Sequence, residues 1–531
     1  MTKSVNYSRR RLLKNTAVAS ALVAGSSSVL GETNPQLQTR SGGVSGTRRN
    51  GLNIFKGIPY AASTQGRRFL PPLKEEAWHG LRDAAEYAKS APQRSDESYS
   101  EDCLYLNCWT PGLSDGGKRP ILFYIHGGGY ATGSGSDPLY DGSSLCHQGD
   151  VVVVTVNHRL NAFGYLYLAD LAGDEYAHSG NVGQLDLIAA LRWVQEHAEA
   201  LGGDRHNVTV FGQSGGGAKI ATLMAMPMAK ELFHRAWTMS GQQVTAAGPR
   251  SATQRAQRFL DALKPNGSLA QQLEAVASAP VEQLLEATKV EDFSRVEDKS
   301  LHFCPVMDSG VLPRHPFWPD APVQSAHIPM VIGNTKDETR AFLGKPENFA
   351  LTWADLPAKI RKQQFVDISP ERVVEHYRKL YPNYSPSDIF FASTTAGRSW
   401  RGAVEELQVR AEQGSNTWAY QLDWGSPLDG GKYGAFHTLD IPLVFNNIHQ
   451  PGSRTGGGEQ ALQVADTMSR TLLAFAHSGS PNAENLPKWE PYTLAERKTM
   501  VFDVPSQQHK DPRGAERKFY AKVPFMQRGT Y

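Results

Sequence analysis

The stretch VFGQSGGG, from Val210 to Gly217, lies between a segment with the apolar pattern of a strand and a segment with the apolar pattern of a helix. The residues that lead into it, NVTVF, form a short apolar run rich in β-branched side chains, which is typical of a buried strand. The residues GGAKIATLMAM at its end are helix formers with apolar side chains near helical spacing. A Gly-x-Ser-x-Gly motif at a strand-to-helix turn is the context of a nucleophile elbow. Ser214 is therefore a candidate nucleophile. Because the motif alone is weak, a mobile glycine-rich surface loop is the alternative.

The glycines around Ser214 each have an expected role. A side chain at Gly212 or Gly216 would collide with the neighbouring strand and helix. The N–H of Gly215 lies at a helix start, where an anion is stabilised. A second glycine run, YIHGGGY at 124–130, also follows a strand, and its backbone N–H groups can approach a ligand closely. The two runs together predict an oxyanion hole. A phosphate-binding loop is disfavoured, because no Lys-Ser/Thr pair follows the glycines.

Apolar runs like the one before Ser214 recur along the chain. They lie at 120–125, 151–156, 207–211, 329–333 and 417–422. Runs that are apolar on both faces indicate strands of a sheet covered on both sides. Helical spacing in VGQLDLIAALRWVQEHAEALGG, with Gly202 as a C-terminal stop, predicts a crossover helix between two of them. We therefore predict an α/β fold with a mostly parallel sheet. Segments 250–300 and 350–415 are expected to add helices at the rim, where they shape the mouth of the site.

Length, charge and cysteine content narrow the class. The chain has 531 residues and a net charge of +2, and this nearly neutral charge does not indicate a nucleic-acid-binding protein. No internal linker or repeat is evident, and we predict one domain over 32–531. The four cysteines are Cys103, Cys108, Cys146 and Cys304. They are too sparse for a disulfide scaffold, and we expect most of them to be buried free thiols.

The N-terminal residues 1–31 have the layout of an export signal. A basic segment, SRRRLLKN at 8–15, precedes an apolar segment of about ten residues, whereas a membrane-spanning helix needs about twenty. The basic segment closely resembles the twin-arginine export motif. Cleavage could follow Ala24 or Gly31. We expect export by the twin-arginine machinery of a bacterium to the periplasm or medium, with no stable membrane anchor.

A serine nucleophile needs a base, and the base needs an acidic group to orient it. His437, in YGAFHTLDIPLVF, lies just past the predicted strand 417–422. Asp337 and Glu338 lie just after the end of strand 329–333, where catalytic groups gather in α/β sheets. Adjacent residues cannot both face one histidine, and spacing does not choose between them.

Several motifs occur together in a characteristic order. They are FKGIPYA (55–61), SEDCLYLN (100–107), HGGGY (126–130), VNHRLNAFGYL (156–166), GNVGQLDLIAALRWV (180–194), GGDRHNVTVFGQSGGG (202–217), PVMDSGVLP (305–313), GNTKDET (333–339) and AFHTLDIPLVF (435–445). This series, which spans most of the chain, resembles the type-B carboxylesterases, a family that includes cholinesterases and bacterial para-nitrobenzyl esterases.

The resemblance implies an α/β-hydrolase fold and hydrolysis of small-molecule carboxylic esters through an acyl-enzyme. No metal or organic cofactor is implied, and we expect a monomer. His126 is expected to support the glycine loop. The implied site residues are the nucleophile Ser214, the acid Glu338 rather than Asp337, the base His437 and the oxyanion donors Gly128, Gly129 and Gly215.

The chain also departs from the family pattern. Gln213 and Gly215 stand where the family usually has Glu and Ala. Cys103 matches a cysteine that is normally bridged, but Ala91 stands near its partner's place. No tryptophan lies between Ala91 and Cys103, so a choline substrate is not supported. Amides, carbamates or lactones are alternative substrates for the same triad. A non-catalytic cholinesterase-like binding protein is the alternative from another class.

Overall fold

A large twisted sheet organises the computed structural model, which describes residues 34–95, 97–292, 300–308 and 310–527. The predicted export signal lies outside these residues. Within them, the sheet has eleven strands in the order β14-β13-β12-β11-β10-β9-β7-β8-β6-β4-β3. The seven strands from β13 to β8 are parallel, and the strands at both edges are antiparallel. The predicted α/β fold with a mostly parallel sheet is confirmed.

The strands of this sheet have the following bounds: β3 Thr47–Arg49, β4 Leu52–Pro59, β6 Tyr105–Thr110, β7 Arg119–Ile125, β8 Val152–Val156, β9 Gly203–Gln213, β10 Arg235–Met239, β11 Met330–Thr335, β12 Thr417–Leu422, β13 Lys498–Phe502 and β14 Gln507–Lys510. A small second sheet contains β1 Gln36–Gln38, β2 Gly43–Ser45 and β5 Leu81–Asp83. All five apolar runs that predicted strands are strands of the large sheet.

Helices cover both faces of the sheet. Their bounds are α1 Ser143–Gly149, α2 Asn161–Tyr165, α3 Ala169–Ala172, α4 Val182–His197, α5 Gly215–Ala225, α6 Pro249–Leu263, α7 Leu269–Ser278, α8 Val281–Ala287, α9 Thr339–Phe342, α10 Leu356–Arg361, α11 Pro370–Leu380, α12 Pro386–Thr395, α13 Arg401–Gln413, α14 Asp440–Val444, α15 Glu459–Ser478 and α16 Gly514–Tyr520.

Alternate residues of a central strand show the two covered faces. In β7, Ile121, Phe123 and Ile125 pack in one hydrophobic core with side chains of α4, α5 and α13. Leu122 and Tyr124 point the other way, into a second core with α1, α14 and α15. Successive side chains of a strand point to opposite faces, so a strand covered on both sides must be apolar throughout. This explains why the strand signal was continuous rather than alternating.

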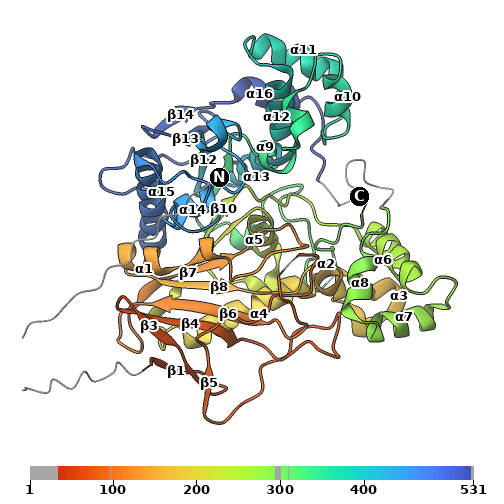
Figure 1. The fold of residues 1–531 in the computed structure, drawn as a ribbon, viewed down its shortest axis with the longest axis vertical. Coiled ribbons are helices and arrows are strands. Elements are labelled where there is room, and N and C mark those ends of the chain that lie inside the picture. Colours follow the sequence, from red (N-terminus) through yellow and green to blue (C-terminus); the bar gives the residue numbers. More distant parts are fainter. Residues whose placement is uncertain (1–33, 96, 293–299, 309, 528–531) are drawn as a thin grey trace, which may run out of the picture. The chain divides into compact units, whose positions relative to one another are not determined.

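The predicted rim segments are helical. Segment 250–300 contains α6, α7 and α8, and segment 350–415 contains α10 to α13. Figure 1 shows α6–α8 and α10–α12 as two separate groups of helices. Each group has its own hydrophobic cluster, distinct from the two cores that line the sheet.

The end of α4 shows how Gly202 acts as a stop. The regular helix ends at His197, and one further turn leads to Gly202, whose φ is +70°. The N–H of Gly203 donates to the carbonyl of Ala198 (2.8 Å), and the N–H of Gly202 donates to that of Glu199 (2.9 Å). These two bonds form a Schellman motif, which favours glycine at its left-handed position. The predicted stop is therefore correct.

All four cysteines are buried and none forms a disulfide among the described residues, as expected for most of them. Among the described residues, no helix is long and apolar enough to cross a bilayer.

Candidate active site

Ser214 occupies the turn between β9 and α5. Its backbone has φ 55° and ψ −124°, a conformation that costs about 1–3 kcal/mol for a residue with a side chain. Two hydrogen bonds hold it there: the N–H of Ser214 donates to the carbonyl of Met239 (2.7 Å), and the N–H of Ala218 donates to the carbonyl of Ser214 (3.1 Å). Ser214 is partly exposed, whereas its neighbours in the strand and helix are buried. The strained turn therefore presents this one side chain at the end of the sheet.

The flanking glycines are required by close backbone contacts. A Cβ on Gly216 would lie 1.9 Å from the carbonyl oxygen of Ile125, at the end of β7. A Cβ on Gly212 would lie 2.7 Å from the same oxygen. Neither distance is possible for real atoms, so any larger residue would push α5 away from the sheet.

The glycine loop after β7 lies directly against the start of α5. Gly128 and Gly129 have φ values of 82° and 62°, which favour glycine. A Cβ on Gly215 would lie 1.9 Å from the carbonyl oxygen of Gly129, so the two backbones touch. Among the described residues, the N–H groups of Gly128, Gly129 and Gly215 donate no hydrogen bond. The structure therefore brings the three predicted oxyanion donors together with their N–H groups free.

His437 and Glu338 are in contact, although 99 residues separate them along the chain. Nδ1 of His437 is hydrogen-bonded to Oε2 of Glu338, whose side chain is fully buried. Oε1 of Glu338 accepts from the N–H of Thr335 (3.0 Å) and from Nδ2 of Asn334 (3.2 Å). Both donors lie at the end of β11, so the strand end fixes the carboxylate.

The two groups shift each other's pKa. Burial alone would raise the pKa of Glu338, but the charge and hydrogen bond of His437 outweigh it and hold that pKa below its ordinary value. Burial alone would lower the pKa of His437, but the Glu338 carboxylate outweighs it and raises that pKa. An ionised Glu338 accepting the Nδ1 proton leaves Nε2 of His437 as a hydrogen-bond acceptor.

The side-chain amide of Gln213 lies within hydrogen-bond distance of this acceptor nitrogen. Its Nε2 lies 3.3 Å from Nε2 of His437, and its side chain is buried. No hydrogen bond between the Ser214 hydroxyl and His437 is present in this structure. Catalytic hydrogen bonds are often long before substrate binds, so His437 stays a candidate base for Ser214. Sequence reasoning noted Gln213 as a departure but missed this contact.

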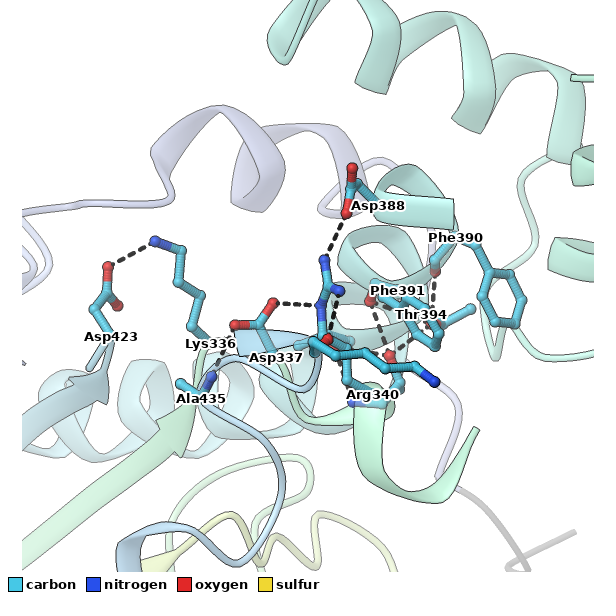
Figure 2. A network of polar contacts seen from close by, with 12 residues as sticks. Lys336, Asp337, Arg340, Asp388, Phe390, Phe391, Thr394, Asp423 and Ala435 are labelled. Carbon is cyan, nitrogen blue, oxygen red and sulfur yellow. Dashed lines mark hydrogen bonds and ion pairs between the residues drawn. The ribbon is translucent and has the colours of Figure 1, made fainter. Parts of the chain in front are cut away.

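Asp337 points toward Arg340 and the backbone of Ala435 (Figure 2). Its Oδ2 accepts from the N–H of Ala435 (3.0 Å), and its Oδ1 accepts from Nε of Arg340 (3.1 Å). Arg340 in turn contacts Asp388 (2.6 Å). Sequence spacing did not distinguish Asp337 from Glu338, but in the structure only Glu338 of the two contacts His437.

A second buried carboxylate lies near this pair. Asp440 follows His437 by three residues and is fully buried at the start of α14. Its Oδ2 accepts from the hydroxyl of Tyr420 (3.0 Å). Burial and the nearby Glu338 carboxylate raise the pKa of Asp440 to about 7. Sequence reasoning did not select it; the only available signal was an acid within AFHTLD.

A cavity of about 400 Å³ lies beside the glycine loop. Tyr130, Ala131 and Thr132 line it on the loop side, and Leu285 of α8 and Phe303 line it on another. Helix α8 therefore borders a cavity next to Tyr130, at the end of the glycine loop. Within the described ranges, no three His, Cys, Asp or Glu side chains gather as a metal site would require.

Comparisons with known proteins agree over almost the whole chain. The family model described as "Carboxylesterase family" matches residues 33–520. The para-nitrobenzyl esterase of Bacillus subtilis (strain 168) is 35% identical over 507 residues, covering 92% of this chain and 98% of that protein. The phenmedipham hydrolase of Pseudarthrobacter oxydans is 31% identical over 497 residues, covering 88% and 95%.

A solved structure shows the same likeness in three dimensions. The Geobacillus stearothermophilus carboxylesterase EST55, determined at pH 6.2, superposes with a TM-score of 0.81. It is 37% identical in sequence, and the match covers 91% of this chain and 99% of that one. At this identity and coverage, the likeness extends from the sheet to the rim helices.

Proposed function

The chain belongs to the carboxylesterase family and is a carboxylic-ester hydrolase, and from this premise we propose that Ser214, Glu338 and His437 form its catalytic triad. The observation that carries the proposal is the hydrogen bond from His437 to Glu338, at the same end of the sheet as the strained Ser214 turn. It supplies a base that is oriented by a buried acid, as an activated serine requires.

In the first half-reaction, neutral His437 takes the hydroxyl proton of Ser214 as the oxygen attacks the ester carbonyl. The free N–H groups of Gly128, Gly129 and Gly215 stabilise the oxyanion that forms. His437 then returns the proton to the departing alcohol, and the acyl group stays on the serine. In the second half-reaction, water gives its proton to His437 as its oxygen attacks the acyl-enzyme, and His437 then returns that proton to the Ser214 oxygen as the carboxylic acid is released. Glu338 stabilises the imidazolium in both halves.

The test is replacement of Ser214 by alanine. We expect Ser214→Ala to lower kcat for a para-nitrophenyl ester by a factor on the order of 10⁶. A fluorophosphonate probe should label the parent protein and not the variant, whereas a non-catalytic binding protein would not react at all. Near-normal turnover by the folded variant would refute the triad.

The substrate is proposed to be a small-molecule ester. This part of the proposal is supported by the family match and by the para-nitrobenzyl esterase relative. The same triad could act on amides, carbamates or lactones. A panel of these classes would decide, with phenmedipham included because one relative is named for its hydrolysis.

Export is a separate part of the proposal. The segment at 8–15 supports twin-arginine export to the periplasm or medium. In a bacterial host, replacing Arg9 and Arg10 by lysine should leave the esterase activity in the cytoplasmic fraction. Unchanged export of the double variant would refute the twin-arginine route.

A further inference from the structure

Lys219 is a fully buried lysine on α5, in the second turn after Ser214. It forms no ion pair with any described residue, and burial is the cause that lowers its pKa to about 7. An unpaired cationic group is among the costliest groups to bury, and an apolar side chain of similar length would pack there at less cost. The catalytic steps proposed above do not use this amino group.

The contacts of Lys219 lie on the glycine loop. Its Nζ donates to the carbonyl oxygen of His126 at 3.2 Å. The same Nζ lies 5.5 Å from the centre of the Tyr130 ring, within the range of a cation–π contact. His126 and Tyr130 bracket Gly128 and Gly129. The side chain therefore contacts both ends of the segment that carries two of the proposed oxyanion donors.

The groups packed around Lys219 do not neutralise it. His126 and His158 are fully buried with ring centres 4.6 Å apart, and burial lowers both pKa values, that of His126 to about 3. Both imidazoles are therefore neutral near pH 7. The hydrogen bonds that lead from Tyr130 end at the carboxyl of Glu406 on α13, and burial raises the pKa of that carboxyl to about 8.

Glu406 reaches the loop only through intermediates. Its Oε1 accepts from the N–H of Gln243 (2.8 Å), and Oε1 of Gln243 accepts from the hydroxyl of Tyr130 (2.8 Å). Glu406 thus anchors the far side of Tyr130, while Lys219 faces the ring. The loop is held between α5, which follows the Ser214 turn, and α13, which packs on the same face of the sheet.

We propose that Lys219 is a positioning residue for the oxyanion hole: its amino group holds the His126 carbonyl and the Tyr130 ring so that Gly128 and Gly129 keep their N–H groups aimed at the reacting carbonyl. This role rests on the proposed function, because it acts on the same hole. It also explains why a polar side chain stands at a position where packing alone favours an apolar one.

The experiment replaces Lys219 by methionine, which keeps the length and removes the donor. We expect kcat of Lys219→Met to fall by about 10- to 100-fold, since misplacement by about 1 Å costs up to about 10². KM should stay within about twofold of the parent. The affinity for a trifluoromethyl ketone, which forms an oxyanion on the serine, should fall by the same factor as kcat. Lys219→Gln, which keeps a neutral N–H donor, should lie between the methionine variant and the parent.

The matched control is Leu223→Ala, a cavity substitution one turn along the same helix. It should lower thermal stability while leaving kcat and ketone affinity near those of the parent. A Lys219→Met variant with unchanged kcat and ketone affinity would overturn the proposal. If both Lys219 variants fail to fold while Leu223→Ala folds, the residue serves stability and the positioning role is wrong.

The outcome is separable from the proposed function itself. If Ser214→Ala stays active, the triad is wrong whatever Lys219→Met does. If Ser214→Ala is inactive and Lys219→Met is fully active, only the role of Lys219 is wrong.

Discussion

Adding a single methyl group at Gly215 should disrupt the proposed oxyanion hole without unfolding the protein. A Cβ at this position would lie 1.9 Å from the carbonyl oxygen of Gly129, and ordinary van der Waals contact begins at 3.4 Å. The loop must therefore move away by about 1.5 Å. The atom that it meets is backbone, so no side-chain rotation can relieve the clash. Gly215 has an ordinary helical conformation, so alanine itself is tolerated by α5.

The expected magnitude follows from that displacement. Loss of one oxyanion donor typically costs about 2.7–4 kcal/mol of transition-state stabilisation, or 10²–10³ in kcat. We expect Gly215→Ala to lose about that factor in kcat, with KM little changed. Steady-state hydrolysis of a para-nitrophenyl ester gives both constants, and the burst of nitrophenol counts the serines that acylate. Thermal unfolding checks that the fold is intact.

The matched control is Gly248→Ala, because a Cβ at Gly248 meets nothing within 4 Å. It should retain parental kcat and stability. A folded Gly215→Ala variant with kcat within threefold of the parent would refute the reasoning, since the loop would then have moved without cost. The family usually carries alanine here, so the variant also asks whether this chain has adapted its glycine loop to Gly215.

The remaining predictions concern Glu338 and Gln213, the two side chains hydrogen-bonded to His437, with Asp337 as a comparison. Glu338→Gln should lower kcat by several orders of magnitude, by analogy with a triad whose acid is replaced by its amide. Asp337→Asn should retain most of the activity. If steady-state assays instead show the larger loss of kcat for Asp337→Asn, Asp337 is the acid of the triad and Glu338 is not. Gln213→Glu places a carboxylate beside Nε2, which stabilises the imidazolium and raises the pKa of His437 further. Because the neutral form is the base, the acidic limb of the kcat/KM profile should move to higher pH by about 1–3 units, and an unmoved limb would contradict the contact.

The strands, the end of α4 and the Ser214 turn could be predicted from the sequence. Continuous β-branched runs predicted strands because a doubly covered sheet has no polar face, and Gly202 predicted a stop because few other residues tolerate its φ. The Gly-x-Ser-x-Gly turn was also readable, since its steric demands involve residues close in sequence. In each case the physical cause lies within a few residues of the signal.

The partners of those residues could not be read locally. Spacing left Asp337 and Glu338 equivalent, and the family resemblance rather than any derivation favoured Glu338. The structure distinguishes them because their side chains point in different directions after the end of β11. Asp337 contacts Arg340, whereas Glu338 contacts His437. Asp440 gave no distinct signal either, because an acid in a helix start is usually solvated and this one is buried.

The sequence by itself determined the sheet, the strained serine turn and the two glycine runs, because strand period, helix period and the steric freedom of glycine act over short distances. Only the tertiary structure decided which groups meet: Gln213 with His437 across 224 residues, Lys219 with His126 across 93, and Gly215 with Gly129. These contacts depend on how the loops after β7 and β9 and the loop before α14 converge at the carboxyl end of the central strands. Burial there turns an ordinary lysine and an ordinary aspartate into groups with shifted pKa values, and burial is a property of the whole fold.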